Sequence, residues 1–506
     1  MKVHLLFRDR DFDIEQALPP NESALVQDLA LNTLFDAMAS GDKFVLQVAK
    51  HAVLSGLQDD LDTILYRQAV LKDCLRSFPV VEKIYDIAVD ALESKRKQWW
   101  FGHHSNYPSG TLHGSVGLMQ MLMDALGKLK SLGDTHSGAF ESEGFTQFFA
   151  VLRTELAEEY FARVKTHLKD LKFRQGVLIS AQLGHGNQGG NYVLRKLTGR
   201  EPSWIERLLL RAQREYTFHI APRDEGGARA LGELRDRGIN LAANALAQSA
   251  DHILSYFVML QRELAFYLAC VNLHRQLVQK GVPVCFPVPV GPGAREHRCA
   301  GLRDVCLVLS MERPVVGNDL DADGKKLCVI TGANQGGKST FLRGVGLAQL
   351  MMQCGMFVAA ESFSADICRG LFTHCKREED ATMKSGKLDE ELSRLSDLVE
   401  ALVPDSLLLL NESFAATNER EGSEIARQVV CTLLDSHVKI FFVTHLYEFA
   451  RRLAAEKRDN VLFLRAERQP DGRRTFKLLP GEPLETSFGA DLYEKIFEDA
   501  PIDAKP

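Results

Sequence analysis

The residues with the clearest chemistry form a glycine-rich turn in the C-terminal third of the chain. Residues 327–343 read LCVITGANQGGKSTFLR, so a short apolar run leads into Gly332, four further residues, and then Gly337-Lys338-Ser339. Glycines let backbone N–H groups curl around phosphate oxygens, and a helix that starts directly after the turn adds the positive end of its dipole. This is the pattern of a P-loop. It predicts binding of ATP with Mg²⁺, with Lys338 on the outer phosphates and the Ser339 hydroxyl on the metal ion. The predicted phosphate-binding residues are Gly332, Ala333, Asn334, Gln335, Gly336, Gly337, Lys338, Ser339 and Thr340.

A nucleotide site of this kind needs a second strand that ends in polar or acidic side chains. Residues 406–413 read SLLLLNES, and four consecutive leucines are typical of a parallel strand that is buried on both faces. Glu412 follows the predicted strand at its carboxyl end, where open α/β sheets bind their ligands. We expect Glu412 to orient or deprotonate the attacking water, and a glutamate that only caps the strand is the alternative. Asn411 is a predicted Mg²⁺ contact that carries no charge, so weaker metal binding and slow hydrolysis are expected.

A third apolar run, residues 439–443, ends in Thr444-His445. A histidine just beyond the tip of a strand could contact the γ-phosphate or the water that attacks it. By itself the pattern favours a capping or core histidine over a catalytic one. Phe286 is a candidate to stack on the adenine base.

Length and composition are those of a multidomain globular protein. The chain has 506 residues, which suggests two to four domains, and 45% of them are hydrophobic. The formal net charge is −6, so any contact with nucleic acid must come from local basic patches. The ten cysteines form no Cys-x-x-Cys pair, which is typical of reduced thiols. We find no signal peptide and no apolar stretch that looks long enough to cross a bilayer, so a cytoplasmic location is expected.

Hydrophobic periodicity divides the chain into four parts. Within the first part, 1–172, residues 22–170 read mostly as helix, with helices at about 118–132 and 145–172 and with loops at 101–115 and 131–144. Residues 173–238 contain strand-like alternation around a glycine-rich turn, followed by a charged stretch. One long helix is predicted over about 240–280, within a part that spans 239–280. After a boundary rich in Pro and Gly at 281–295, strands and helices alternate to about residue 465 within the last part, 281–506, so the fold class is helical followed by α/β.

Several motifs in this order resemble the ATPase domain of the MutS family of DNA mismatch-repair proteins. Residues 318–343 are similar to the approach and P-loop of that family, and Ser385-Gly386-Lys387 before Glu390-Glu391 resembles its serine loop. The remaining matches are Asn411-Glu412 in place of Asp-Glu, Thr417-Asn418 with Gly422, Thr444-His445, Phe488-Gly489, and Tyr66-Arg67 with Val70 upstream. The resemblance favours a catalytic role for His445.

The resemblance implies a homodimeric ABC-type ATPase with two composite sites. Each site would combine the P-loop of one subunit with Ser385, Thr417 and Asn418 of the other. The four parts would then be a helical core domain (1–172), a clamp-like insertion (173–238), a lever helix (239–280) and the ATPase domain (281–506). No Phe-x-Glu wedge occurs in the sequence, and the chain starts at the core helices. It therefore resembles a short form without the mismatch-recognition and connector domains.

Two basic clusters could contact the DNA backbone. Residues 163–174 hold five basic side chains and one acidic one, and residues 194–214 hold six and two. The candidate contacts to double-stranded, structurally distorted DNA are Lys169, Lys172, Arg207, Arg211 and Arg214. A solvated helix face is the alternative.

The expected function is an ATPase that couples ATP binding and hydrolysis to closure of a clamp on DNA, in mismatch repair, other DNA repair or recombination. Two alternatives stay open: the same ATPase acting on RNA or ribosomes, and a nucleotide-gated interaction protein that hydrolyses ATP weakly. A metabolic kinase would need an acceptor pocket and a lid, and the sequence gives no sign of either.

Overall fold

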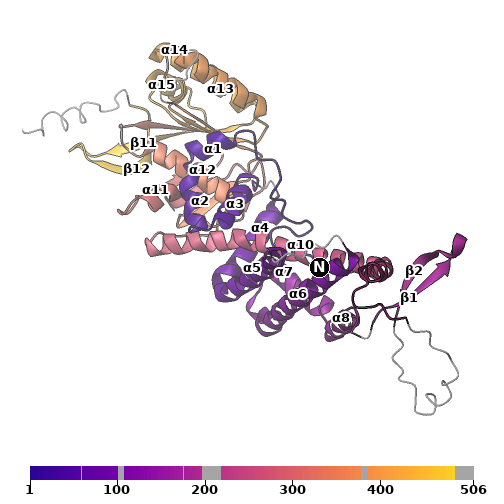
Figure 1. Cartoon of the computed structure of the whole chain (residues 1–506). Coiled ribbons are helices and arrows are strands. Elements are labelled where there is room, and N and C mark those ends of the chain that lie inside the picture. The colour runs from indigo at the N-terminus through magenta and orange to yellow at the C-terminus, as the bar shows by residue number, and fades with distance from the viewer. Residues whose placement is uncertain (58–59, 101–106, 175, 197–217, 378–385, 485–506) are drawn as a thin grey trace, which may run out of the picture. The chain divides into compact units, whose positions relative to one another are not determined.

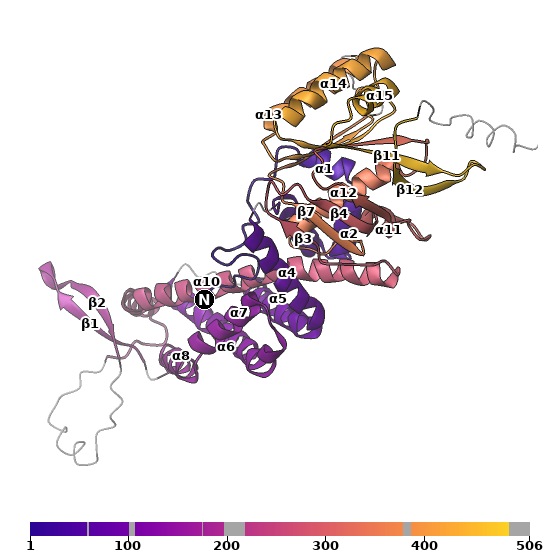
Figure 2. The ribbon, with the colours of Figure 1, turned by 180° about the vertical axis from the view of Figure 1, so that it is seen from behind.

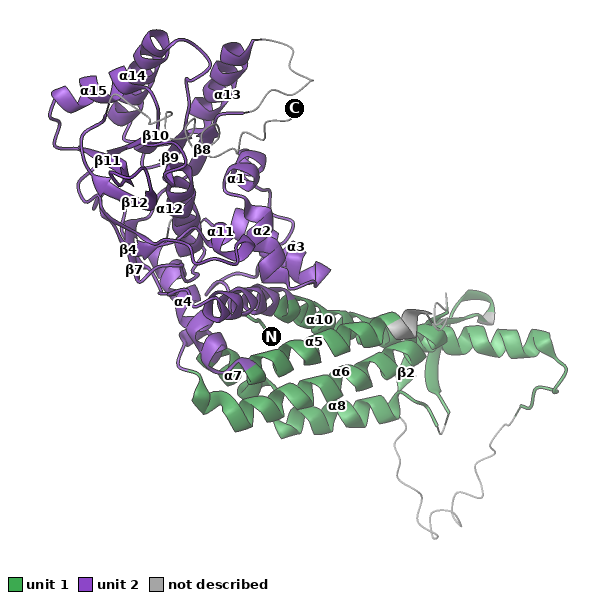
Figure 3. Cartoon of the chain, turned by 90° about the vertical axis from the view of Figure 1, so that its left-hand side faces the viewer, with its two compact units in different colours: residues 1–3, 79–140, 146–261 green, residues 4–78, 141–145, 262–506 purple. Residues whose placement is uncertain are grey.

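The structure is a computed structural model of the whole chain (Figure 1). It describes residues 1–57, 60–100, 107–174, 176–196, 218–377 and 386–484. The chain forms two compact units (Figure 3). Unit 1 comprises residues 1–3, 79–140 and 146–261, and unit 2 comprises residues 4–78, 141–145 and 262–506. Each unit is described by itself below.

Unit 1 is built from long helices and one β-hairpin. Its helices are α5 (Phe78–Trp100), which starts one residue before the unit, α6 (Pro108–His136), α7 (Glu143–Glu155, mostly in this unit), α8 (Glu158–Asp170) and the first part of α10 (Glu225–Gln279). Figure 3 shows α5, α6 and α8 lying alongside one another. The hairpin pairs β1 (Leu178–Leu183) with β2 (Gly189–Arg195) in antiparallel fashion, as the alternation around the glycine-rich turn predicts.

The helices of unit 1 differ from the predicted ones at their ends. The expected loop at 101–115 is wrong over its second half, because α6 starts at Pro108, a residue that suits the first turn of a helix. The expected loop at 131–144 is wrong at its start, since α6 continues to His136. The single helix predicted over 145–172 is two helices, α7 and α8, with the buried Leu156 between them.

Helix α10 starts about fifteen residues earlier than predicted, at Glu225. The side chain of Asp224 accepts a hydrogen bond from the Gly227 backbone N–H at 2.8 Å, which satisfies one free donor of the first turn. The charged stretch that follows is rich in Ala, Leu, Glu and Arg, all strong helix formers. Capping and propensity therefore outweigh the unfavourable effect of the glycines in this stretch.

By length and composition alone, α10 could cross a membrane, which corrects the expectation that no stretch is long enough. Its most apolar window is 61% buried inside the protein. A core helix passes the same test because it is apolar on most of its faces.

Unit 2 starts with a segment that is fixed by one buried carboxylate. Glu263, on the last part of α10, is fully buried and accepts hydrogen bonds from the backbone N–H groups of Leu5 (2.6 Å), Leu6 (3.2 Å) and Phe12 (3.3 Å). Arg67 donates from Nε to the Leu6 carbonyl at 3.0 Å. The helices α1 (Glu22–Asp28), α2 (Leu31–Ala39), α3 (Lys43–Leu54) and α4 (Leu61–Arg76) follow.

The main sheet of unit 2 has six strands in the order β12-β11-β6-β10-β9-β8. Its strands are β6 (Leu327–Gly332), β8 (Leu371–Cys375), β9 (Leu407–Asn411), β10 (Lys439–Val443), β11 (Val461–Arg468) and β12 (Arg474–Pro480). All neighbours are parallel except the pair of β11 and β12. The apolar runs of β6, β9 and β10 are buried on both faces, as expected for central parallel strands.

Helices cover both faces of this sheet. Figures 1 and 2 show α13 (Lys387–Ala401), α14 (Glu419–Asp435) and α15 (Tyr447–Ala455) on one side and α12 (Lys338–Gln353) on the other. Val430, Leu434 and Phe449 pack against Leu408 and Phe442 in one apolar cluster. A smaller sheet, in the order β3-β7-β4-β5, contains β3 (Val288–Val290), β7 (Ser362–Asp366), β4 (His297–Leu302) and β5 (Asn318–Asp321). The short helix α11 (Val305–Ser310) lies between β4 and β5 in the chain.

The prediction of a helical part followed by an α/β part is thus confirmed at this level. The boundaries of the four predicted parts and the clamp and lever roles stay predictions.

Candidate functional site

The turn between β6 and α12 has the backbone shape that the glycine pattern predicts. Gly332, Gln335 and Gly337 have φ values of 106°, 58° and 90°, in the left-handed region. A Cβ atom on Gly332 would lie only 2.8 Å from the backbone nitrogen of Ala466. Glycine is therefore required at 332 for both conformation and space, and the turn is tightly curled where α12 begins.

Lys338 is folded into this turn. Its ammonium donates to the carbonyl oxygens of Gly332 and Ala333, each at 3.0 Å, and its side chain is buried. Burial lowers the pKa of Lys338 to about 8, and the nearby carboxylate of Glu412 partly offsets this effect. The ammonium is thus held next to the turn in a partly desolvated position. Its electrostatic attraction for an anion is stronger there than it would be in water.

Ser339 and Asn411 meet across the sheet. The Ser339 hydroxyl donates to Asn411 Oδ1 at 2.9 Å, although 72 residues separate them. The strand register explains the contact, because Val443 of β10 pairs with Ile330 of β6 on one side and with Asn411 of β9 on the other. A hydroxyl and an amide oxygen therefore lie together next to the turn, and both are suitable ligands for a hard cation.

Glu412 and His445 form a second pair at this edge. Glu412 Oε1 lies 3.2 Å from His445 Nε2. The pKa of Glu412 is lowered, mainly by the hydrogen bond from His445 and further by the positive charges of Lys376 and Lys338, while burial opposes the shift. The carboxylate is therefore ionised at neutral pH, so His445 Nε2 carries the hydrogen of this bond. Glu412 has φ 55° and its N–H donates to the Val443 carbonyl at 2.8 Å.

The segment after Glu412 is fixed by two buried polar side chains. Glu391 on α13 accepts a hydrogen bond from the Phe414 N–H at 2.6 Å, and Phe414 also has a left-handed φ of 67°. His374 Nδ1 lies 2.7 Å from the Ser413 hydroxyl, and burial lowers the pKa of this histidine to about 4. His374 has no motif around it in the sequence, and only its position inside an apolar strand could have drawn attention to it.

The residues predicted to act in a partner's site make contacts within their own helix cap. Thr417 donates to Glu421 Oε2 at 2.7 Å, and Asn418 Oδ1 accepts the Glu421 N–H at 3.0 Å, which caps α14. Their role in trans stays a prediction. Ser385 and the Phe488-Gly489 motif lie outside the described residues.

The prediction that Phe286 stacks on adenine is wrong, because Phe286 lies far from the 332–339 turn. Phe286 contacts Phe357 edge-on, with ring centroids 6.4 Å apart, and Lys72 lies over its ring at 4.8 Å. Phe357 follows the C-terminal end of α12, whereas the 332–339 turn lies at the N-terminal end. A helix of 16 residues separates the two ends by about 24 Å.

Phe476 of β12 is an exposed aromatic residue whose backbone lies beside the turn, and sequence reasoning missed it. It is 48% exposed and has φ 62°, and a Cβ on Gly337 would lie 3.6 Å from the Phe476 Cα. The Asn318 side-chain amide donates to its carbonyl at 3.1 Å, and Arg474 Nε donates to the Asn334 carbonyl at 3.3 Å. In the sequence, Phe476 is an isolated aromatic residue with no motif around it.

The basic residues of unit 1 are only partly described. Lys169 and Lys172 are exposed at the end of α8. Asp170, between them, pairs with Lys196 at 3.8 Å, which joins this end of α8 to the end of the β-hairpin. Arg207, Arg211 and Arg214 lie outside the described residues.

Comparison with known proteins assigns the family. A family model for the MutS2 N-terminal domain matches residues 59–280, and a model for MutS domain V matches residues 328–497. This chain belongs to the MutS family. The domain V match contains every described residue of the site from Gly332 to His445, and the MutS2 N-terminal match contains α8 and the hairpin.

The MutS-family relatives are much longer than the aligned segments. The chain is 32% identical over 180 residues to the DNA mismatch repair protein MutS of Chloroflexus aurantiacus, which covers 32% of this chain and 18% of that protein. It is 32% identical over 140 residues to human MutS protein homolog 4, covering 28% and 15%. For the MutS of Porphyromonas gingivalis the identity is 32% over 180 residues, covering 34% and 20%. The chain thus spans a fifth or less of these curated relatives.

Proposed function

We propose that this MutS-family protein is an Mg²⁺-dependent ATPase that couples ATP binding and hydrolysis to the closure of a clamp on DNA. The observation that carries the proposal is the meeting, at one edge of the sheet, of the Lys338 ammonium, the Ser339–Asn411 pair and the Glu412–His445 pair. These groups come from three separate strand ends, and each has the chemistry that a nucleotide site needs.

The turn and Lys338 bind the triphosphate. The backbone N–H groups from Gly332 to Thr340 surround the phosphates, and the ammonium of Lys338 exchanges its two carbonyl partners for phosphate oxygens. Ser339 and Asn411 are the residues that would hold Mg²⁺, whose chemistry is to neutralise phosphate charge. Their oxygens fit this ion, because hydroxyl and amide oxygens are hard ligands.

Glu412 acts on the attacking water. Its ionised carboxylate can orient the water and accept its proton, and His445 holds the carboxylate in place through Nε2. Glu391, through the Phe414 N–H, fixes the segment that carries Glu412 and acts as a positioning residue.

Phe476 is the proposed stacking surface for the adenine ring, because its side chain is exposed and its backbone and Cβ lie next to Gly337. Aromatic rings that stack on bases tolerate partial exposure before the ligand binds.

The DNA-binding surface includes Lys169 and Lys172 at the end of α8, with Arg207, Arg211 and Arg214 farther along the chain. The active protein is a cytoplasmic homodimer, in which Ser385, Thr417 and Asn418 of each subunit complete the nucleotide site of the other. Structure-specific duplex DNA is the preferred partner.

A second candidate function is favoured by Asn411. A neutral amide on the Mg²⁺ side of the site lowers metal affinity compared with a carboxylate. The protein would then be a nucleotide-gated interaction protein, in which ATP binding rather than turnover sets the conformation.

Changing Glu412→Gln should reduce ATP turnover by about 100-fold or more, because general-base catalysis is lost, while ATP affinity stays close to that of the wild type. Phosphate release and calorimetric titration with ATP measure the two quantities. Glu400→Gln, at an exposed carboxylate on α13, is the matched control and should hydrolyse ATP normally. Wild-type turnover in Glu412→Gln would rule out the proposed role.

Changing Asn411→Asp should lower the Mg²⁺ concentration for half-maximal turnover and raise the maximal rate. The new carboxylate can still accept the Ser339 hydrogen bond and adds a charge next to the metal ion. A large gain in rate supports the binding-switch candidate for the natural protein. An unchanged Mg²⁺ dependence would mean that Asn411 does not contact the metal.

Changing Phe476→Ala should weaken ATP binding about tenfold, since base stacking contributes roughly 1–3 kcal/mol. Binding of tripolyphosphate, which has no base, should stay the same. Leu479→Ala, another partly exposed apolar residue of β12, is the control. Equal losses for ATP and tripolyphosphate would indicate damage to the turn rather than loss of stacking.

The combined change Lys169→Gln and Lys172→Gln should weaken binding to all duplexes and reduce the slope of log affinity against log salt by about 2. Mismatched, branched and homoduplex DNA and an RNA duplex are compared at stated salt, with and without ATP. The control pair is Lys83→Gln with Lys128→Gln, two exposed lysines elsewhere in unit 1. If the RNA duplex binds more tightly than each of the DNA substrates, the RNA alternative is favoured. If no duplex binds, the proposal of a clamp on nucleic acid is rejected.

A further inference from the structure

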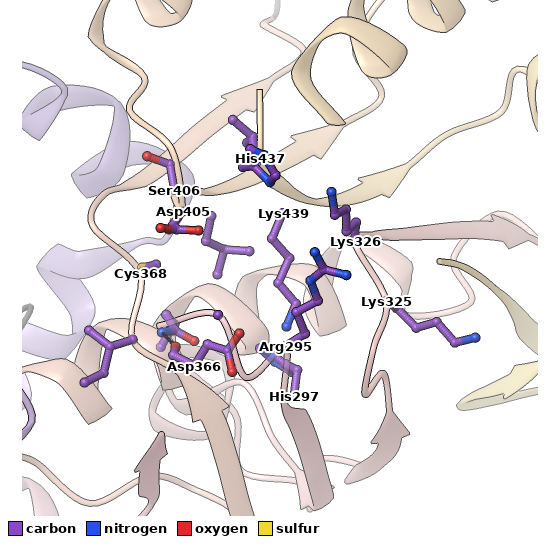
Figure 4. Close-up of a pocket in the computed structure, with 15 residues that line it drawn as sticks. Arg295, His297, Lys325, Lys326, Asp366, Cys368, Asp405, Ser406, His437 and Lys439 are labelled. Atoms are coloured by element: carbon purple, nitrogen blue, oxygen red, sulfur yellow. Dashed lines mark hydrogen bonds between the residues drawn. The ribbon is translucent and has the colours of Figure 1, made fainter. Parts of the chain in front are cut away.

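A second cavity lies at the opposite edge of the six-stranded sheet from the 332–339 turn. Lys326 directly precedes β6, Leu407 starts β9 and Lys439 starts β10. These strands are parallel, with Lys439 paired to Leu407 and Ile440 to Leu327, so their starting ends share one edge. Residues from the smaller sheet, including His297 of β4 and Asp366 of β7, close the other side (Figure 4). The cavity is partly open to solvent and has a volume of about 200 Å³.

Basic side chains dominate the lining. Arg295, Lys325, Lys326 and Lys439 line the cavity together with only two carboxylates, Asp366 and Asp405. Figure 4 shows the side chains of Arg295 and Lys439 lying beside each other in this space, with Lys326 at its border. The fixed charges therefore leave an excess of two positive charges before either histidine of the lining, His297 or His437, is counted.

Two of the four basic side chains form no ion pair or hydrogen bond with these carboxylates or with any other described residue. Asp366 Oδ1 accepts the Glu296 N–H at 2.7 Å, and burial raises the pKa of Asp366. Lys439 donates to the Glu296 carbonyl at 3.3 Å, and Lys325 donates to the Asp459 carbonyl at 2.6 Å. Among the described residues, the side chains of Arg295 and Lys326 have no ion pair or hydrogen bond. Two cations are thus free to bind a ligand.

His297 is a lining residue whose ring is almost completely buried. Its side chain is 1% exposed, and Nε2 has no hydrogen-bond partner among the described residues. The ring packs against Phe363 and Phe441, with centroids 5.4 Å and 5.1 Å away. Burial, together with the charge of Lys439, lowers the pKa of His297 well below its usual value, so the ring is neutral.

An unpaired buried nitrogen is unfavourable by roughly 1–3 kcal/mol, and such groups are uncommon in folded proteins. The guanidinium of Arg295 adds the flat two-donor geometry that suits phosphate oxygens. A volume of 200 Å³ holds one tetrahedral oxyanion and several waters, since each water takes about 30 Å³.

We propose that this cavity is a second anion site, which binds a phosphate-class oxyanion through Arg295, Lys326 and Lys439. The ligand is inorganic phosphate or the phosphate group of a small molecule. This site is separate from the nucleotide site, because it lies at the other ends of the same parallel strands. It does not depend on the ATPase activity proposed above.

The test uses the full chain with Lys338→Ala, so that phosphate cannot bind through Lys338 at the 332–339 turn. Isothermal titration with inorganic phosphate should still detect one site. Adding Arg295→Gln or Lys326→Gln should weaken that binding about tenfold or more, because each removes a charged hydrogen-bond donor. Both side chains reach solvent, so these variants keep the core intact. Arg451→Gln, an exposed arginine on α15, is the matched control and should bind as before.

A second titration with AMP separates the two sources of phosphate. Equal affinities for phosphate and AMP would mean that inorganic phosphate alone fills the site. Tighter binding of AMP would mean that the ligand is a phosphorylated small molecule. Both results support the site. The proposal is overturned if the Lys338→Ala chain takes up neither ligand. It is equally overturned if Arg295→Gln and Lys326→Gln bind both ligands as tightly as Arg451→Gln does.

Discussion

The candidate nucleotide site depends on the register of three parallel strands. Val443 at the end of β10 pairs with Ile330 on one side and with Asn411 on the other, so β6, β10 and β9 end at the same level. This alignment brings the 332–339 turn, Asn411-Glu412 and Thr444-His445 to one edge. Slipping β9 by one residue would turn Asn411 to the opposite face, because side chains alternate along a strand.

Electrostatics at this edge are arranged around a partly desolvated lysine. Lys338 is held by two carbonyl oxygens and loses part of its hydration, which lowers its pKa. The charge of Glu412 partly offsets the lowered pKa of Lys338, and the hydrogen bond from His445 lowers the pKa of Glu412 and so keeps its carboxylate ionised. Each charge therefore stabilises the charged form of the other. In the same sheet, the basic cavity at the opposite edge has no equivalent balance, because its carboxylates are fewer than its cations.

The sequence was sufficient for the parts of the site that sit at strand ends. Lys338, Ser339, Asn411, Glu412 and His445 each follow an apolar run, and parallel strands bring such positions together whatever their separation in the chain. Phe476 and His297 could not be found in this way, since their surroundings come from strands that are distant in sequence. Helix ends were predicted poorly where one cap decides them, as at Asp224 before α10 and at Pro108 in α6. The stacking role predicted for Phe286 was wrong because the sequence alone does not show that this residue contacts the C-terminal end of α12 rather than its N-terminal end.

The buried carboxylate of Glu263 couples the first residues of the chain to protons. Burial raises its pKa to about 7, against an ordinary value of 4.5, despite three backbone N–H donors. The folded protein therefore keeps a proton that the unfolded chain releases once the pH exceeds 4.5. The stability from this group is complete below that pH and is lost as the pH rises through about 7. The attachment of residues 5–12 to α10 is thus weakest on the alkaline side of neutrality.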